Sequence, residues 1–420
     1  MSRSGRIVLS VVGAVVVITG ATLAVTRPWA DASTATADQH GFVRYANAVA
    51  FPPPYKGTES GAMLGLIPYG QCAMGLGEVE DASTQPTYWS GGGDCEHLGM
   101  NGSGTGEAEP DSGPASSHPG GSLLTGGVVT ADGSVIAVGE DQEHNDYNAS
   151  SGQVYSIGSG MNLVTELDSP QNADKQWQDK NGQVMFNAIA QVGTTLLVGG
   201  RQSSPTSEGR PTIWSSTDGG RTLTPIDLPA PASLVAGVDA MAVHGDTVLA
   251  LGNATADEQH DTLIGWLSTD QGRTWSDIGR QSFAASSISG IVFANGRWFA
   301  AGDTEGAKMP EPVLLTSSDA RHWQVTSLPA PQGGGSVTGL TVDRTGTPIV
   351  VGWTGGPPSG QDATTTECGA IWLTTPPATW TDAATGCGGP TPTGVVTLAD
   401  GRVLVASDHD LWIRGVGNRG

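Results

Sequence analysis

Three aspartates with matching neighbours are the first candidates for chemistry in this 420-residue chain. Asp218 and Asp270 lie in copies of Ser-Thr-Asp-x-Gly-Arg-Thr, and Asp319 lies in a shorter copy, so that 52 and 49 residues separate them. Carboxylate pairs hydrolyse glycosidic bonds when a pocket fixes their separation. An aspartate here can instead accept hydrogen bonds from its own turn, which accounts for the spacing fully. We therefore interpret the motif as structural. Its residues are Asp218, Gly220, Asp270, Gly272, Trp275, Asp319 and Trp323.

An acidic run is the second candidate. Glu140, Asp141, Glu143 and Asp146 offer oxygen ligands of the kind that Ca²⁺ prefers. The run does not fit the EF-hand loop, and a solvated acidic loop is the other explanation. We expect no other metal or cofactor. The chain has no G-x-S-x-G, Walker A or H-E-x-x-H motif, so the sequence assigns no catalytic residue.

A repeat of about 50 residues positions these motifs. Each unit has two short apolar strands joined by a tight turn such as Asp132-Gly133 or Asn295-Gly296, and the second strand ends in glycine. A polar loop, a third strand, the aspartate turn and a fourth strand follow. The strands that end in glycine are 135–139, 196–199, 249–252, 298–302 and 349–352, and a sixth copy at 403–407 ends in serine.

Four antiparallel strands per unit predict an all-β fold, a six-bladed β-propeller, with seven blades as an alternative. The sixth unit supplies only three strands, so we expect residues 42–100, which include the strand-like 86–89, to close the ring or to form most of a seventh blade. The expected blades span 126–185, 186–237, 238–287, 288–336, 337–391 and 392–416.

Ser-x-Asp-x-Gly-x-x-Trp at the turn between third and fourth strands resembles the Asp-box, or BNR repeat, of sialidase-like propellers. The resemblance covers about 126–416 and is strongest at 268–275. It implies that the box lies on the face away from any active site. The arginines, the Phe/Tyr-Arg-Ile-Pro motif and the Tyr/Glu pair of the sialidases cannot be assigned in this chain. We therefore expect a non-sialidase, exported bacterial member.

Loops between second and third strands lie on the face opposite the boxes, and propellers commonly bind ligands there. The residues that follow the marker strands are expected to form the rim of the central channel. A tryptophan at this rim could stack on a sugar or clamp a peptide, or it could pack against its own loop. The rim residues are Glu140, Asn253, Asp303, Trp353 and Asp408.

The N-terminal segment 1–37 predicts export. Arg3 and Arg6 precede an uncharged stretch over 7–26, which is long enough for a spanning helix, and 30–32 and 35–37 resemble cleavage sites. A retained single-pass anchor and a cleaved signal peptide both remain open. Either one places 38–420 outside the cytoplasm.

Cysteine content and charge fit this location. The four cysteines predict two disulfides, and we prefer the pairs closest in sequence, Cys72–Cys95 and Cys368–Cys387. The net charge of −22 disfavours nucleic acid and anionic lipid. We expect a monomer that meets a membrane only through its N-terminal segment, and that binds a protein or glycan ligand.

Three functions remain open for the predicted domains, which are the export segment 1–37, a ring-closing segment with linker at 38–125, and the propeller at 126–420. The first function is a binding or scaffolding module without catalysis at the cell surface. The second is a carbohydrate-active hydrolase, a sialidase-like glycosidase. The third is an assembly factor for an envelope complex.

Overall fold

The computed structural model describes residues 35–51, 61–81, 83–103, 121–142, 150–167, 183–204, 207–229, 235–255, 261–279, 287–304, 309–331, 333–355, 367–375 and 379–416. All of them belong to one compact unit, Thr34–Gly420. They form strands and turns apart from a single turn of 3-10 helix, η1 (Ala37–His40). The expected apolar helix at 7–26 lies outside the described residues. Within the described ranges no helix could span a membrane.

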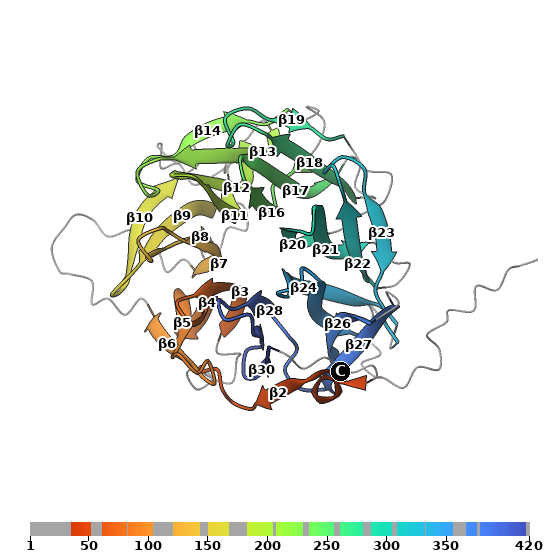
Figure 1. Ribbon diagram of the computed structural model, residues 1–420. Coiled ribbons are helices and arrows are strands. Elements are labelled where there is room, and N and C mark those ends of the chain that lie inside the picture. Colours follow the sequence, from red (N-terminus) through yellow and green to blue (C-terminus); the bar gives the residue numbers. More distant parts are fainter. Residues whose placement is uncertain are drawn as a thin grey trace, which may run out of the picture. The chain divides into compact units, whose positions relative to one another are not determined.

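Seven antiparallel sheets make up this unit, and six of them are built from consecutive strands. Each is one blade, counted here in chain order (Figure 1). The first blade consists of β3 (Gly61–Tyr69), β4 (Cys72–Asp81), β5 (Ser83–Gly91) and β6 (Leu98–Ser103). The second consists of β7 (Gly121–Val129), β8 (Val135–Gln142), β9 (Ser150–Ile157) and β10 (Met161–Leu167). The third consists of β11 (Val184–Val192), β12 (Thr195–Ser204), β13 (Ser207–Ser216) and β14 (Thr224–Asp227).

The next three blades follow the same order. The fourth blade consists of β16 (Ala240–His244), β17 (Thr247–Thr255), β18 (Asp261–Ser268) and β19 (Ser276–Asp277), with the short β15 (Val235–Ala236) beside β17. The fifth consists of β20 (Ser287–Ala294), β21 (Arg297–Thr304), β22 (Glu311–Ser317) and β23 (Gln324–Ser327). The sixth consists of β24 (Gly335–Val342), β25 (Pro348–Thr354), β26 (Cys368–Thr375) and β27 (Thr379–Cys387), and β1 (Ala35–Thr36) pairs with β27 in parallel.

The seventh blade joins the two ends of the chain. Its inner strands are β28 (Gly394–Thr397), β29 (Val403–Ala406) and β30 (Leu411–Arg414), and its outer strand is β2 (Phe42–Tyr45), which pairs with β30. The innermost strands of neighbouring blades touch all the way round, and β28 touches β3. The missing fourth strand therefore comes from the N-terminal part, as expected, and the ring has no open seam.

The expectation of six blades was wrong, and the seven-bladed alternative is what the structure shows. The reason is that 38–125 contributes more than a closing strand. Residues 61–103 form a complete blade with its own tight turn at Gly70, while 42–45 close the ring. The strand-like Pro86–Trp89 lies in β5, the third strand of that first blade.

The glycine that recurs in each second strand has a common physical cause. First strands β3, β7, β11, β20 and β24 each contain a β-bulge, where the register shifts by one residue. A Cβ on the facing glycine would collide with a backbone carbonyl oxygen of the first strand or, for Gly252, with that of Gly237 between β15 and β16. We call these the marker glycines. They are Gly77, Gly139, Gly200, Gly252, Gly302 and Gly352.

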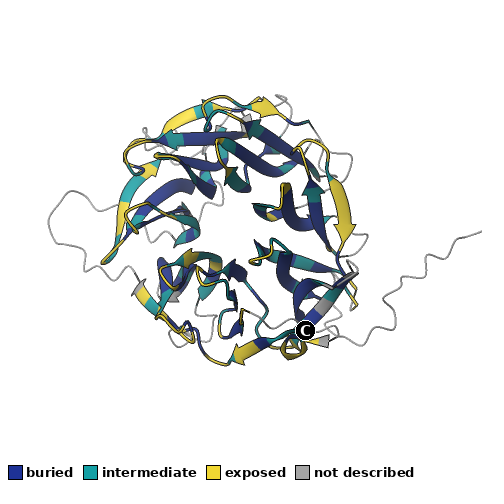
Figure 2. Cartoon of the chain, in the orientation of Figure 1, coloured by how far each residue is buried: buried dark blue, intermediate teal, exposed yellow. Residues whose placement is uncertain are grey.

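Tryptophans of the third strands fill the spaces between blades. Trp89, Trp214, Trp266, Trp372 and Trp412 are at most 2% exposed. The indole N–H of Trp266 donates to the carbonyl of Pro229 (2.8 Å), and that of Trp372 to Pro329 (2.7 Å), each just beyond the outer strand of the preceding blade. In Figure 2 the second and third strands of the blades are mostly buried, whereas outer strands such as β14 and β23 are mostly exposed.

Candidate functional site

The aspartates of the three motifs that resemble the Asp-box, which we call the boxes, hold their own turns. In the fourth blade the Asp270 Oδ1 atom accepts from the Ser268 hydroxyl (2.8 Å) and the Thr274 N–H (2.9 Å), and Oδ2 accepts from the Thr274 hydroxyl (2.6 Å). These hydrogen bonds favour the ionised form and lower the pKa of Asp270 to about 2. Gly272 has a φ of 82°, in the left-handed region that favours glycine.

The other two boxes repeat this arrangement. Asp218 Oδ1 accepts from the Ser216 hydroxyl and the Thr222 N–H, and Asp319 Oδ1 accepts from the N–H groups of Arg321 and His322. The pKa of Asp218 is lowered to about 2 by its hydrogen bonds, the largest from the Thr222 N–H, and that of Asp319 lies well below its usual range. Such strongly ionised, turn-forming carboxylates are poor general acids.

The boxes also join neighbouring blades. Trp275 is half-buried against the core between the third and fourth blades, and Gly220 packs against Val154 of the second blade. Trp323 packs beside Ala320, whose carbonyl accepts its indole N–H (3.3 Å). The Gln271 N–H donates to Asp246 (2.9 Å) in the turn between first and second strands. This contact places the turn between first and second strands at the same end of the propeller as the boxes. We call this end the box end.

The opposite end carries one residue after each marker glycine, or after Ser407 in the seventh blade. We call these seven the ring residues. They are Glu78, Glu140, Arg201, Asn253, Asp303, Trp353 and Asp408. The sequence predicted five of them but placed them at the first loop position, whereas β8, β17, β21 and β25 continue past them to Gln142, Thr255, Thr304 and Thr354.

Two ring carboxylates bind the neighbouring blade instead of facing a ligand. Asp303 accepts from the N–H of Val337 (2.8 Å) and the hydroxyls of Ser336 (2.5 Å) and Ser287 (3.1 Å). Val337 lies at the bulge of β24, and Asp408 accepts from Met63 (3.0 Å) at the equivalent place in β3. Asp303 is 4% exposed, and burial raises its pKa. Both aspartates therefore hold seams between blades.

The remaining ring residues differ in accessibility. Glu140 is buried, while Asn253 and Trp353 are half-buried. Arg201 contacts Gln183 Oε1 (3.4 Å) and Met185 Sδ (3.0 Å) of its own blade. Trp353 lies opposite Ser336 in the ladder and belongs to none of the apolar clusters of the described residues.

Glu78 and Arg201 escaped the sequence prediction. Glu78 belongs to the first blade, whose repeat has no Asp-box to reveal it. The sequence does not single out Arg201, because 199–200 is a glycine pair and the spacing of the repeat predicts Gly199 as the marker. The bulge in β11 faces Gly200, so the ring residue of the third blade is the next one.

The candidate Ca²⁺ loop is only partly described. Glu140 and Asp141 lie in β8, while Glu143 and Asp146 lie outside the described residues. Among the residues that are described, no three His, Cys, Asp or Glu side chains gather as metal ligands would.

Tyr45, Tyr88 and Tyr155 lie in surroundings that do not activate a phenol. The Tyr155 hydroxyl donates to Gln153 Oε1 (2.5 Å), and burial raises the pKa of Tyr155. Burial also raises the pKa of Tyr45 and Tyr88. An activated phenol needs a lowered pKa.

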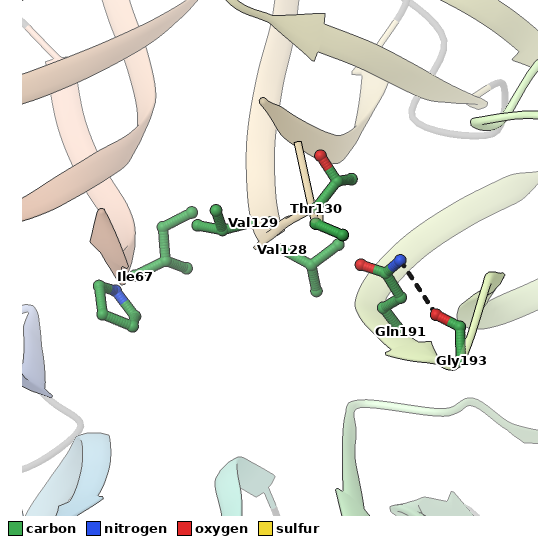
Figure 3. A pocket seen from close by; sticks show the side chains of 9 residues that line it. Ile67, Val128, Val129, Thr130, Gln191 and Gly193 are labelled. Atoms are coloured by element: carbon green, nitrogen blue, oxygen red, sulfur yellow. Dashed lines mark hydrogen bonds between the residues drawn. The ribbon is translucent and has the colours of Figure 1, made fainter. Parts of the chain in front are cut away.

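A cavity of about 580 Å³ opens at the box end of the ring, between the first three blades. Its walls come from the ends of β3, β7 and β11 and from the turns that follow (Figure 3). Ile67, Pro68, Val128 and Val129 make it mainly apolar, and the polar side chains at its edge are Thr130 and Gln191. No motif of the sequence predicts this cavity.

Both predicted disulfides are present. Cys72–Cys95 links the start of β4 to the loop after β5, and Cys368–Cys387 links the start of β26 to the end of β27. The second disulfide ties the hairpin whose aspartate turn is lost, as expected. Two disulfides fit an oxidising compartment.

No protein-family model matches the chain, and no curated protein matches it either. Among solved structures, it is similar to Trypanosoma rangeli sialidase in complex with the inhibitor DANA (15% identity, TM-score 0.44), covering 70% of this chain and 55% of the sialidase. It is also similar to a protein of unknown function from Dyadobacter fermentans (12% identity, TM-score 0.47), covering 70% of this chain and 94% of that protein. A third similar structure is Penicillium chrysogenum alpha-L-arabinanase complexed with arabinobiose (15% identity, TM-score 0.39), covering 68% of this chain and 90% of the arabinanase. The chain thus spans about half the length of the sialidase. Similarity at this level says nothing of a shared substrate.

Proposed function

We propose that this chain is an extracytoplasmic binding module without catalytic activity, whose propeller takes a glycan or protein ligand at the ring end, around Trp353. The observation that carries the proposal is the contrast among tryptophans. The five third-strand tryptophans are sealed between blades, whereas Trp353 keeps part of its surface accessible at the end of a second strand. A partly accessible tryptophan held on a rigid strand suits stacking on a sugar or a peptide.

The carboxylates support a role without catalysis. Within the described ranges, the three Asp-box aspartates hold turns, and Asp303 and Asp408 hold seams between blades. Asp410 pairs with Arg44 of β2. A general acid or base must be able to reach its substrate, and these groups are engaged in holding the scaffold together.

Two features support the proposed location outside the cytoplasm. The two disulfides fit an oxidising compartment, and the uncharged stretch over 7–26 follows two arginines, as in an export segment. Anchor and cleaved signal make different predictions for N-terminal sequencing of the exported protein. A start near Asp38 identifies a signal peptide, and an intact N-terminus identifies an anchor.

A glycan array and a panel of immobilised surface proteins, probed with the purified full-length chain, test the binding role. We expect a retained ligand whose affinity falls about 10-fold or more in Trp353→Ala and recovers in Trp353→Phe, because an aromatic face restores stacking. Binding that is unchanged in Trp353→Ala would move the site elsewhere on the propeller.

A hydrolase is the second candidate, in which Asp303 would have to act as the general acid in addition to holding the seam to the sixth blade. Burial raises the pKa of this carboxyl, which is the property a general acid of a glycosidase needs. A screen with aryl-glycosides distinguishes the two functions. Turnover that Asp303→Asn abolishes while the thermal midpoint is kept would establish catalysis and refute the binding-only role.

A further inference from the structure

We infer a second binding site, at the box end, in the cavity between the first three blades. We propose that it takes an aliphatic side chain of a protein partner that carries a neighbouring Lys or Arg. This site goes beyond the ring-end function, since the two lie at opposite ends of the propeller.

The shape and lining of the cavity fit an aliphatic group. Figure 3 shows Ile67 of β3 and Val129 of β7 pointing toward one another, with Val128 on the side of Gln191. Val129 is 38% exposed, and its surface remains in contact with water. Covering apolar surface yields roughly 25 cal/mol per Å², and a cavity of about 580 Å³ has the size of a small ligand pocket.

The polar groups at the edge are directed to the protein itself. Gln191 Nε2 donates to the Gly193 carbonyl (3.3 Å), and the Thr130 hydroxyl donates to Asp132 Oδ1 (2.5 Å). Among the described residues, no ionisable side chain lines the cavity. A charged group buried in it would lose its hydration without a partner, so the part of the ligand that enters must be uncharged.

Charge complementarity selects the group beside the aliphatic side chain. Asp132 directly follows Ala131, a lining residue, and all its side-chain hydrogen bonds from Thr130 and Ser134 go to Oδ1. These bonds, the largest from Thr130, lower the pKa of Asp132 to about 2, so the group is ionised near neutral pH. Its Oδ2 atom can therefore accept from a cation outside the cavity. The chain's net charge of −22 adds to the attraction for a basic partner.

Selection from a phage-displayed library of random linear peptides on the full-length protein tests this inference. We expect enrichment of peptides with Leu, Ile, Val or Met beside Lys or Arg, and loss of that enrichment on Val129→Asp. Ala131→Glu, on the exposed turn, provides a second variant if Val129→Asp does not fold. Val43→Asp is the matched control, because Val43 is 56% exposed on β2 of the seventh blade.

Titration calorimetry with one enriched peptide then measures each part. Relative to the unmodified protein, we expect about 10-fold weaker binding for Val129→Asp and about 3-fold weaker binding with a smaller salt dependence for Asp132→Asn. Trp353→Ala and Val43→Asp should bind normally, so a failure of the ring-end function leaves this test intact. Equal enrichment on Val129→Asp, or enriched peptides without an aliphatic residue or a basic one, would overturn the inference.

Discussion

The fourth and sixth blades hold their outer strands, β19 and β27, by different means. In the fourth blade the turn is an Asp-box and the outer strand β19 has only 2 residues. In the sixth blade the aspartate is lost, but β27 has 9 residues and a disulfide joins its far end to β26. The same division runs through the ring. Blades with a box have outer strands of 4, 2 and 4 residues (β14, β19, β23), and those of the other blades built from consecutive strands have 6, 7 and 9 (β6, β10, β27).

This difference indicates what the box contributes. A two-residue ladder supplies few backbone hydrogen bonds, so an outer strand that short must be held by its turn. A longer ladder, closed by a covalent link, has no need of the aspartate. We therefore interpret the box as a local substitute for a longer outer strand.

The largest expected loss of stability is one that the fourth and sixth blades should show equally. Trp266→Ala and Trp372→Ala should each lower the free energy of unfolding by about 3–5 kcal/mol, because both remove a buried indole and its hydrogen bond to the preceding blade. Equilibrium unfolding in urea measures both variants. Costs that differ by more than the fitting error would show that the blades differ in their cores and not only in their turns.

Removal of the sixth-blade disulfide should come next. Cys368→Ala with Cys387→Ala opens a link that spans 19 residues, and the expected loss is about 3 kcal/mol from the entropy of the unfolded chain. Thermal unfolding of this double variant, beside Cys72→Ala with Cys95→Ala, measures it. A sixth blade that keeps its full stability without the link would mean that the long ladder suffices alone.

The sequence predicted the blade plan well because that plan is local. Marker glycines, tight turns and third-strand tryptophans recur at a fixed period. Each of them is required by a contact within one blade or with the adjacent blade. The first blade was left undecided because it has no box and its marker, Gly77, lies in a stretch rich in glycine. The periodic signal fades there although the strands form.

Side-chain engagement could not be predicted in the same way. The spacing predicts Asp303 and Asp408 at the end of the propeller opposite the boxes. Only the structure shows that backbone N–H groups at the bulges of β24 and β3 donate to them across the seams. The box-end cavity depends on how three first strands converge, which no single repeat encodes. The sequence repeat predicts where a residue lies within its blade. Which group its side chain contacts in the adjacent blade depends on the tertiary structure.

A smaller effect should separate the fourth blade from the sixth. Asp270→Ala removes the acceptor of the Thr274 N–H and hydroxyl, so the amides of 272–277 should exchange with solvent faster while those of β27 are unchanged. Hydrogen exchange with mass spectrometry measures both segments. The control is Asp227→Ala, an exposed aspartate of β14 outside any box. Equal exchange in Asp270→Ala and Asp227→Ala would show that the carboxylate does not hold the turn.

Acid should reproduce the same difference at smaller amplitude in the unmodified protein. Hydrogen bonds lower the pKa of Asp270 from 3.8 to about 2, so the folded turn binds its proton less readily than the unfolded chain does. The stabilisation is thus complete above about pH 4 and is lost as pH falls toward 2. Exchange at 272–277, corrected for its intrinsic pH dependence, should rise over this interval, whereas exchange in the disulfide-linked β27 should not. The rise should be absent in Asp270→Ala, because the group that titrates is then missing. A rise of equal size in β27 would assign the acid sensitivity to the ring as a whole and not to the box.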